Sequence, residues 1–334
     1  MREGICVAGN MIVDITYPVE GWPKQGELVH IHDGIIRSTG GAVCNVGVDL
    51  MKLDPSFRVY AMGRIGDDAE GALIRETLEA HGIDMANVIQ EGISAFCNVM
   101  ADVKNKQRTF FTYMGANARF TEQDIDWDRV DAGIFHIGYI LLLDALDQPD
   151  PEYGSRMTRL LCQAQAHGLR TSIDVVSEAS DRFTRLVPPA MKYTDYCIIN
   201  EYEAEMTTGI KLRGPQGELL TDHVPVALKA MKDMGVSTWV VIHCPEGGYG
   251  LDEHDRFIQL GSLVLPKGYI KGSVGAGDAF CAGVLYGAEK GWTLEKAIDL
   301  GIASAAASLS APGATEGMCS QAEALALFEK YDRR

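Results

Sequence analysis

The sequence lacks any CxxC cysteine pair, any long apolar run and any apolar segment followed by a cleavage site. Its eight cysteines are scattered singly along 334 residues, which disfavours a disulfide framework or a zinc site and fits reduced thiols in the cytoplasm. No stretch of 18 apolar residues occurs, and the N-terminal sequence is typical of a strand. We therefore expect a cytoplasmic protein that has neither a signal peptide nor a membrane helix.

Five common catalytic or ligand-binding motifs are also absent. The sequence contains no GxxxxGK[ST] loop, no GxGxxG after its first strand, no HExxH, no GxSxG and no EF-hand loop. Acidic residues outnumber basic ones by 46 to 30, and the resulting net charge of −16 disfavours binding to nucleic acid or to an anionic membrane. Phosphorylated small molecules remain open as ligands, because they need only local donors and a metal.

The order of strand-like and helical patterns predicts the fold class. From about residue 57, short β-branched runs alternate with helical patterns, as in FRVYAM followed by DDAEGALIRETLEAHG, where Gly82 is typical of a helix C-cap. Alternation of this kind, with nearly continuous apolar strands, is typical of a parallel sheet covered by helices on both faces. We expect a single α/β domain over residues 1–334, with a doubly wound, mostly parallel sheet.

Two segments break the alternation, at about residues 12–38 and 94–115. Both are typical of antiparallel strands with polar turns, the second turn falling at residues 104–107. They could form one small accessory β-sheet that is an edge extension, a dimer surface or a lid over a site, and these roles are compatible. Because an unpaired strand edge is costly to expose, we expect a homodimer formed through this sheet.

A glycine-rich turn precedes an apolar helix in KGSVGAGDAFCAG, at residues 271–283. The first N–H groups of a helix and its dipole favour an anion, so a carboxylate at Asp278 conflicts with a bound phosphate. The conflict disappears if the amides of Gly275, Ala276 and Gly277 hold a transferring phosphoryl group while Asp278 accepts the proton of an alcohol. A plain turn with Asp278 as an N-cap is the alternative.

Asn10 and Asp14 lie just past the first predicted strand, and Gly40 and Gly41 precede a predicted helix that carries Asn45 one turn in. Asparagine and aspartate side chains suit neighbouring sugar hydroxyls, and paired glycines let backbone N–H groups approach a small polyol. The candidates are Asn10, Asp14, Gly40, Gly41 and Asn45.

A carboxylate and an amide lie three residues apart on one predicted helix. Asn200 follows a strand and Glu203 lies on the same face of the next helix. These oxygen-bearing groups could order water around Mg²⁺.

Taken in order, these motifs resemble those of the ribokinase/PfkB sugar-kinase family over nearly the whole chain. The matching segments are GN…D at Asn10 and Asp14, GG-x-x-x-N at 40–45, G-x-x-G-x-D at 63–68, N-x-x-E at 200–203 and GAGD at 275–278. The resemblance implies a ribokinase-like α/β domain with a small β-sheet lid. It also implies ATP-dependent phosphorylation of a hydroxyl, usually a primary alcohol of a sugar or nucleoside.

The resemblance also implies roles for individual residues. Asp278 would be the catalytic base, and residues 275–277 would form the anion hole. The acceptor would be held by Asn10, Asp14, Gly40, Gly41 and Asn45. Asn200 and Glu203 would organise metal and phosphate, with Glu203 contacting Mg²⁺ through water. Asp174, after a mid-chain strand, corresponds either to a further acidic family residue or to a strand-end cap.

Two departures from the family pattern concern the nucleotide side. The pattern D-[TS]-x-G-A-G-D has Gly272 in place of its first aspartate, followed by Ser273, which leaves potassium activation open. In VVIHCPEGGYG, His243 takes the place of a family hydroxyl residue, and Gly248 is the second glycine of a G-x-x-G pattern. We expect the cofactor side to include Ser273, Gly248 and Gly313.

The sequence therefore predicts an ATP- and Mg²⁺-dependent kinase for a small sugar or sugar derivative. A nucleoside kinase of the same family is the alternative within this class. A non-catalytic sugar or nucleotide sensor on the same fold is the alternative outside it. Arg108, Phe110 and Tyr113 lie on the expected lid, where they could face an acidic or aromatic substrate or simply alternate along a strand.

Overall fold

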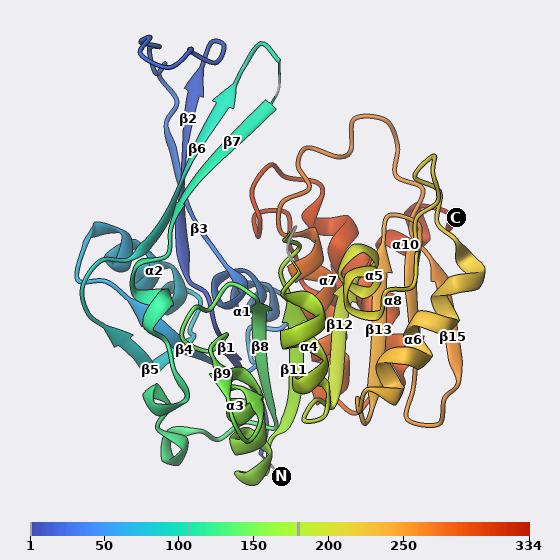
Figure 1. The fold of residues 1–334 in the computed structure, drawn as a ribbon. Coiled ribbons are helices and arrows are strands. Elements are labelled where there is room, and N and C mark those ends of the chain that lie inside the picture. The colour runs from blue at the N-terminus through green and yellow to red at the C-terminus, as the bar shows by residue number, and fades with distance from the viewer. Residues whose placement is uncertain (1, 106, 179–180) are drawn as a thin grey trace.

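A large sheet forms the centre of the molecule (Figure 1). The computed structural model describes residues 2–105, 107–178 and 181–334. Within them, nine strands follow the order β15-β14-β13-β12-β11-β8-β1-β4-β5. Their bounds are β1 Ile5–Ala8, β4 Val59–Ile65, β5 Asp84–Gln90, β8 Ile134–Ile140, β11 Arg170–Val175, β12 Tyr196–Asn200, β13 Trp239–Cys244, β14 Gly247–Leu251 and β15 Phe257–Gly261.

The strands from β13 to β5 run parallel, and β14 and β15 add an antiparallel edge. Strand β1 pairs with β4 on one side and with β8 on the other. The chain first extends the sheet toward β5 and then returns to extend it toward β13. In open parallel sheets, ligands bind at the carboxyl ends of the strands where the direction reverses, which here lies beside β1.

Helices cover both faces of this sheet (Figure 1). Along β1, Ile5 and Val7 pack in one core cluster while Cys6 and Ala8 pack in another, because successive side chains point to opposite faces. The first cluster contains α1 Ala42–Leu53, α2 Ala69–Ala80, α7 Ala276–Glu289 and α8 Leu294–Ser308. The second contains α3 Arg156–Ala166, α4 Phe183–Met191, α5 Glu201–Thr208 and α6 Val224–Asp233. The predicted doubly wound α/β fold is confirmed.

Shorter elements complete the chain. They are α9 Gln321–Leu325, α10 Leu327–Lys330, the strand pair β9 Pro149–Asp150 and β10 Gly154–Ser155, and 3₁₀ helices at Gly115–Arg119, Glu122–Asp124, Trp127–Arg129 and Thr221–His223. Helix α3 precedes strand β11. It begins at Arg156 because the Ser155 side chain accepts a hydrogen bond from the backbone N–H of Thr158. No helix of the described residues has the length and apolar content needed to cross a membrane.

Four further strands of the described chain form an accessory sheet that stands away from the main body (Figure 1). They are β3 Ile36–Gly40, β2 Ile12–Val19, β6 Ala95–Asp102 and β7 Gln107–Tyr113, in the order β3-β2-β6-β7. Each expected segment forms an antiparallel pair, and β2 joins β6 in parallel. Of the expected turn at residues 104–107, Lys106 lies outside the described residues.

A carboxyl group, that of Asp49, lies inside the core. Asp49 is on α1, which packs against α7, and it is fully buried. Neither of its carboxyl oxygens has a hydrogen-bond partner among the described residues. Burial raises the pKa of Asp49 well above its usual value, and the neighbouring Asp278 raises it further. Because an unpaired buried carboxylate is very costly, we expect Asp49 to be neutral in the folded protein.

We expect Asp49→Asn to stabilise the protein increasingly as the pH rises. A carboxyl group whose pKa is raised by folding contributes stability below its unfolded pKa of about 3.9, and this contribution is lost as the pH rises toward the folded pKa. The amide does not titrate, so the variant should gain about 1–3 kcal/mol in the free energy of unfolding at pH 8. The gain should be smallest near pH 4.

Urea unfolding at pH 4, 6 and 8 measures this difference. The control is Asp222→Asn, which changes an exposed aspartate. A difference between Asp49→Asn and the natural sequence that does not change with pH would contradict a neutral Asp49.

Candidate functional site

Polar side chains from several strands meet at one edge of the main sheet. Asn10 follows β1, Tyr139 lies near the end of β8, Asp174 near the end of β11, Asn200 ends β12, and His243 is near the end of β13. Parallel neighbours bring these carboxyl ends to the same edge. The first turns of α1 and α7 lie at this edge as well, because Asn45 of α1 and Tyr139 both contact Asp278 of α7.

Asp278 is held by two donors from separate elements. The Nδ2 of Asn45 donates to Oδ2 of Asp278 over 2.8 Å, and the hydroxyl of Tyr139 lies 3.1 and 3.0 Å from Oδ1 and Oδ2. Helix α7 begins at Ala276 with Gly275 as its N-cap. Asp278 is therefore not an N-cap, and its carboxylate points to the neighbouring helix and strand.

The turn before α7 requires glycine. Gly275 has a φ of 79°, in the left-handed region that favours glycine. A β-carbon at this position would lie 2.4 Å from the carbonyl oxygen of Ala314. The turn therefore depends on close contact with the loop that follows α8, and this contact sets where the first N–H groups of α7 point.

Tyr139 is a site residue that the sequence interpretation missed. Its φ is 62°, unusual for a residue with a side chain, and its hydroxyl reaches Asp278 across 139 positions of sequence. The one sequence signal was its place near the end of the strand-like segment AGIFHIGYIL, where site residues of parallel sheets gather.

Three carboxyl groups at this edge influence one another. Burial raises the pKa of Asp278 to about 6, although the hydrogen bonds from Asn45 and Tyr139 lower it. Burial also raises the pKa of Asp174 well above its usual value and that of Glu203 to about 7, and charge repulsion within the trio adds to both. A nearby cation would relieve this repulsion. Within the described ranges, however, no three His, Cys, Asp or Glu side chains are arranged to hold a metal ion by themselves.

Asn200 and Glu203 form a capping box at the start of α5. The side chain of Asn200 accepts a hydrogen bond from the N–H of Glu203 over 2.9 Å, and Oε2 of Glu203 accepts one from the N–H of Asn200 over 3.0 Å. Oε1 of Glu203 also accepts hydrogen bonds from Ser177 and from Nδ2 of Asn200. The pair is thus fixed locally, with Asn200 facing a cavity beside α7.

The candidates for holding the acceptor surround the first turn of α1. Val43 N–H donates to the carbonyl oxygen of Asn10, and a β-carbon at Gly41 would lie 2.5 Å from that oxygen. The side-chain oxygen of Asn10 accepts a hydrogen bond from Asn117, a second residue that the sequence interpretation missed. Asn10, Gly41 and Asn45 are therefore brought together around this turn.

Asp14 and Gly40 join the accessory sheet to this region. Asp14 lies on β2, and a β-carbon at Gly40 would lie 2.9 Å from its Oδ2. Burial raises the pKa of Asp14, and the charge of Arg108 on β7 opposes that rise. The base of the accessory sheet thus carries a half-buried carboxylate close to α1.

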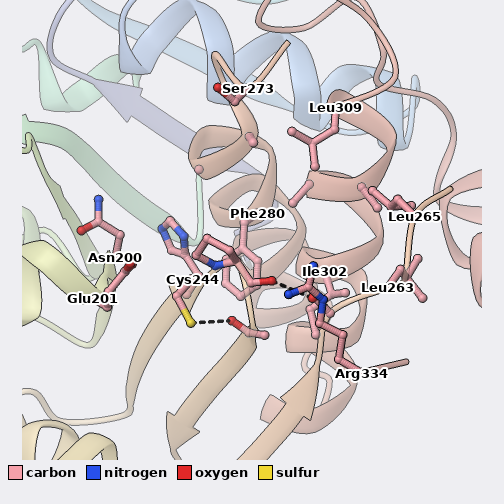
Figure 2. Close-up of a pocket in the computed structure, with 18 of the residues that line it drawn as sticks. Asn200, Glu201, Cys244, Leu263, Leu265, Ser273, Phe280, Ile302, Leu309 and Arg334 are labelled. Atoms are coloured by element: carbon pink, nitrogen blue, oxygen red, sulfur yellow. Dashed lines mark hydrogen bonds between the residues drawn. The ribbon is translucent and has the colours of Figure 1, made fainter. Parts of the chain in front are cut away.

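A cavity of about 540 Å³ lies on the other side of the first turn of α7 (Figure 2). Its lining includes Ser273, Ala276, Gly277 and Asn200, and most of the remaining wall is apolar. Figure 2 shows Asn200 and Glu201 on one side of Phe280, with Leu263, Leu265 and Arg334 on the other. A largely apolar cavity with a few polar groups is typical of a site for a small ligand with a flat apolar part.

His243 forms part of the wall of this cavity. Its ring stacks on Phe280 with centroids 4.9 Å apart, and burial lowers its pKa to about 4, so it is neutral at physiological pH. Its neutral ring therefore forms a flat part of the cavity wall.

Gly248 and Gly313, the two glycines expected on the nucleotide side, do not line this cavity. Gly248 is on β14, where a β-carbon would lie 2.5 Å from Ile298, and its neighbour Gly247 lines the cavity. Gly313 lies in the loop after α8, where a β-carbon would lie 2.7 Å from Glu316. Of the nucleotide-side residues, the structure brings Ser273 and Asn200 to the cavity.

The position of Gly272 is closely packed. A β-carbon there would lie 2.6 Å from the carbonyl oxygen of Pro312 and 3.1 Å from that of Ala311. An aspartate at this position would require the loop after α8 to shift. The aspartate with which the family pattern begins is thus replaced by a glycine against which the loop after α8 packs.

The chain is similar to known kinases in sequence and in fold. The sequence model of the pfkB family carbohydrate kinases matches residues 2–321. A ribokinase of Staphylococcus aureus is 26% identical over 65% of this chain and 66% of that protein. A nucleoside kinase of Methanocaldococcus jannaschii is 21% identical over 98% of each chain. The solved structure of Arabidopsis thaliana ribokinase complexed with ribose and ATP matches with a TM-score of 0.81 and 22% identity, over 98% of this chain and 99% of that one.

We expect Gly275→Ala to lower stability more than a glycine substitution that meets only a backbone penalty. The control is Gly291→Ala, because Gly291 also has a positive φ, of 67°, but no heavy atom of the described chain lies within 4 Å of a β-carbon there. The control should cost about 1 kcal/mol from its backbone conformation alone.

The contact with Ala314 should raise the cost of Gly275→Ala to about 2–4 kcal/mol. Denaturant midpoints of the two variants measure the difference. Equal midpoints would show that the loop after α8 does not press against the turn.

Proposed function

The chain belongs to the pfkB family of carbohydrate kinases, and we propose that it transfers the γ-phosphoryl group of ATP to a hydroxyl of a small sugar or sugar derivative, most simply a primary alcohol. The observation that carries this proposal is the position of Asp278 in the first turn of α7. One side of that turn lines the cavity proposed for ATP, and the Asp278 carboxylate meets Asn45 on the side proposed for the acceptor.

Asp278 is proposed as the base of the reaction. The acceptor O–H bond breaks as the carboxylate takes its proton, and the oxygen forms a bond to the γ-phosphorus. The bond from the γ-phosphorus to the bridging oxygen breaks, and ADP leaves with that electron pair. The raised pKa of about 6 makes Asp278 a stronger base than an ordinary carboxylate while leaving it largely ionised at pH 7.

The backbone of residues 275–277 is proposed to stabilise the migrating phosphoryl group. The first N–H groups of a helix have no intrahelical partner and can bind an anion. In α7 the N–H of Ala276 makes one long hydrogen bond, of 3.4 Å, to the carbonyl oxygen of Ser273, which a bound phosphoryl group would replace. Donors fixed by the fold stabilise charge that develops in the transition state without reorganising. The contact of Gly275 with Ala314 supports this proposal, because it fixes the orientation of the turn.

The acceptor is proposed to bind between α1 and the accessory sheet, which would act as a lid. Asn10, Asp14, Gly40, Gly41 and Asn45 would hold its hydroxyl groups. Their grouping around the first turn of α1 and the base of β2 supports this role.

ATP is proposed to occupy the 540 Å³ cavity, with Ser273 and Asn200 among its polar contacts. Gly248 and Gly313 remain predictions for the nucleotide side. A divalent cation would relieve the charge repulsion among Asp174, Glu203 and Asp278, and Mg²⁺ would be held near Glu203 through water. When bound, Mg²⁺ would neutralise phosphate charge. Activation by K⁺ stays open, because Gly272 replaces the aspartate with which the family pattern begins.

We expect Asp278→Asn to lower kcat by about 10²–10⁴-fold, the usual effect of losing a general base, while ATP still binds. In the natural sequence, kcat/KM should rise with pH through about 6, because Asp278 must lose its proton to act. Release of ADP over a panel of sugars and nucleosides, with and without potassium, identifies the acceptor and measures both effects.

Asp222→Asn is the control for this variant, since Asp222 is exposed and far from α7 in sequence. Normal turnover by Asp278→Asn would exclude Asp278 as the base. Thermal shifts with sugars or nucleosides, without ADP release by the natural protein, would instead support a sensor. Turnover of nucleosides alone would support the nucleoside kinase.

A homodimer through the accessory sheet is also proposed. Strand β7 is exposed along its whole length, and the stacked rings of Trp22 and Phe111 are 55% and 52% exposed. An edge strand and an apolar patch together are costly to leave in water. A second copy of this chain would cover both.

We expect Phe111→Glu to shift the protein toward monomer, because a charge within the covered patch opposes association. Sedimentation velocity over a range of concentrations measures the shift. Phe257→Glu is the control, since Phe257 is 38% exposed on β15, at the edge of the main sheet. This interface would be contradicted if the protein of natural sequence stayed monomeric at high concentration. It would also be contradicted if the protein dimerised and Phe111→Glu left the dimer unaffected.

A further inference from the structure

We propose that Tyr139 is a positioning residue for the carboxylate of Asp278, a role that rests on the proposed function of Asp278 as base. It would hold the carboxylate in a fixed orientation by donating its hydroxyl hydrogen. The family pattern in the sequence gave Tyr139 no role. Its contacts and its backbone conformation are the observations that carry the proposal.

The two donors to Asp278 approach from different elements. Tyr139 comes from the end of β8, with its hydroxyl 3.0–3.1 Å from both carboxyl oxygens, and Asn45 comes from α1, with its Nδ2 2.8 Å from Oδ2. A carboxylate held from two directions keeps one rotamer, and a base must meet its proton within hydrogen-bond reach. Burial and the charge of Asp278 raise the pKa of Tyr139 well above its usual value, so its hydroxyl remains a donor.

The backbone around Tyr139 is held in an unfavourable conformation. Tyr139 and Leu141 have φ values of 62° and 83°, in the left-handed region that is unfavourable for a residue with a side chain. Such strain persists only where surrounding contacts maintain it. Strained backbone of this kind is concentrated at functional segments of proteins.

The contacts that maintain the strain lie away from Asp278. The N–H of Leu142 donates to the carbonyl oxygen of Tyr139 over 3.0 Å, and the N–H of Leu141 donates to Oδ1 of Asp147 over 3.3 Å. Arg182, at the start of α4, donates to the carbonyl oxygen of Leu141 and to Asp147. This bracing places the Tyr139 ring at the edge of the sheet, where its hydroxyl meets Asp278.

The groups around Asp278 determine how loss of the Tyr139 hydroxyl would change the pKa of Asp278. The titratable or polar groups facing it are Asn45 and Asp49 of α1, Tyr139 of β8, Asp174 of β11, Glu203 of α5 and Cys281 of α7 itself. Only Asn45 and Tyr139 donate hydrogen bonds to the carboxylate among the described residues. Without Tyr139, burial and the neighbouring carboxyl groups would favour the protonated, inactive form of Asp278.

We expect Tyr139→Phe to move the acidic limb of the kcat/KM profile upward by roughly one pH unit and, through that shift, to lower kcat about 3-fold at pH 6.5, with KM for ATP unchanged. The ring is kept, so a purely structural role of the ring would leave both readouts unaltered. Tyr60→Phe is the control, because its hydroxyl also donates one hydrogen bond, to the carbonyl oxygen of Asp131, far from this edge.

Replacement of Tyr139 by 3-fluorotyrosine supplies a second variant that keeps the shape and the donor. Its more acidic hydroxyl is a stronger donor, so the acidic limb should move to lower pH. Opposite shifts in the two variants would support positioning by the hydroxyl. If Asp278→Asn is inactive but both Tyr139 variants keep the natural profile and kcat, this inference is wrong and the proposed function stands. Normal turnover by Asp278→Asn would overturn both.

Discussion

The burial of one ionisable carboxyl group, Asp278, at the start of α7 is the constraint on which the rest of the site depends. An unpaired carboxylate could not remain there, because burial strongly favours its protonated form. Hydrogen bonds from Asn45 and Tyr139 compensate in part, and the pKa remains raised, to about 6. The balance yields a group that is ionised near neutral pH and more basic than an ordinary carboxylate, as the proposed role of a base requires.

The topology explains how this balance is reached. Because the sheet extends in both directions from β1, the first turn of α1 and the end of β8 meet at one edge, and α7 packs against α1 there. The donors to Asp278 thus come from elements whose positions are set by the core. The same edge gathers Asp174 and Glu203, whose mutual repulsion leaves the site short of positive charge. A cation arriving with a phosphorylated ligand would supply what the chain lacks.

The tight packing on the nucleotide side has a different origin. Gly275 and Gly272 both lie against the loop after α8. Glycine is favoured at position 275 by its positive φ, and at position 272 because the carbonyl oxygens of Ala311 and Pro312 fill the space that a side chain would need. The family pattern in the sequence indicated the first requirement directly. At position 272 the pattern indicated only that the family's aspartate is missing. The structure shows that the backbone of the loop after α8 occupies the space beside this position.

Patterns in the sequence predicted the features that depend on neighbours along the chain: the alternation of strands and helices, the glycine turn before α7, Asn10 and Asn200 beside strand ends, and Asn45 one turn into a helix. Long-range packing decided that Tyr139 donates to Asp278, that Asp49 is buried with no hydrogen-bond partner among the described residues, and that β2 pairs in parallel with β6. The physical reason is that periodicity and turn chemistry report local backbone preferences. A contact across 139 or 233 positions depends on how whole elements pack, and no short stretch of sequence carries that information.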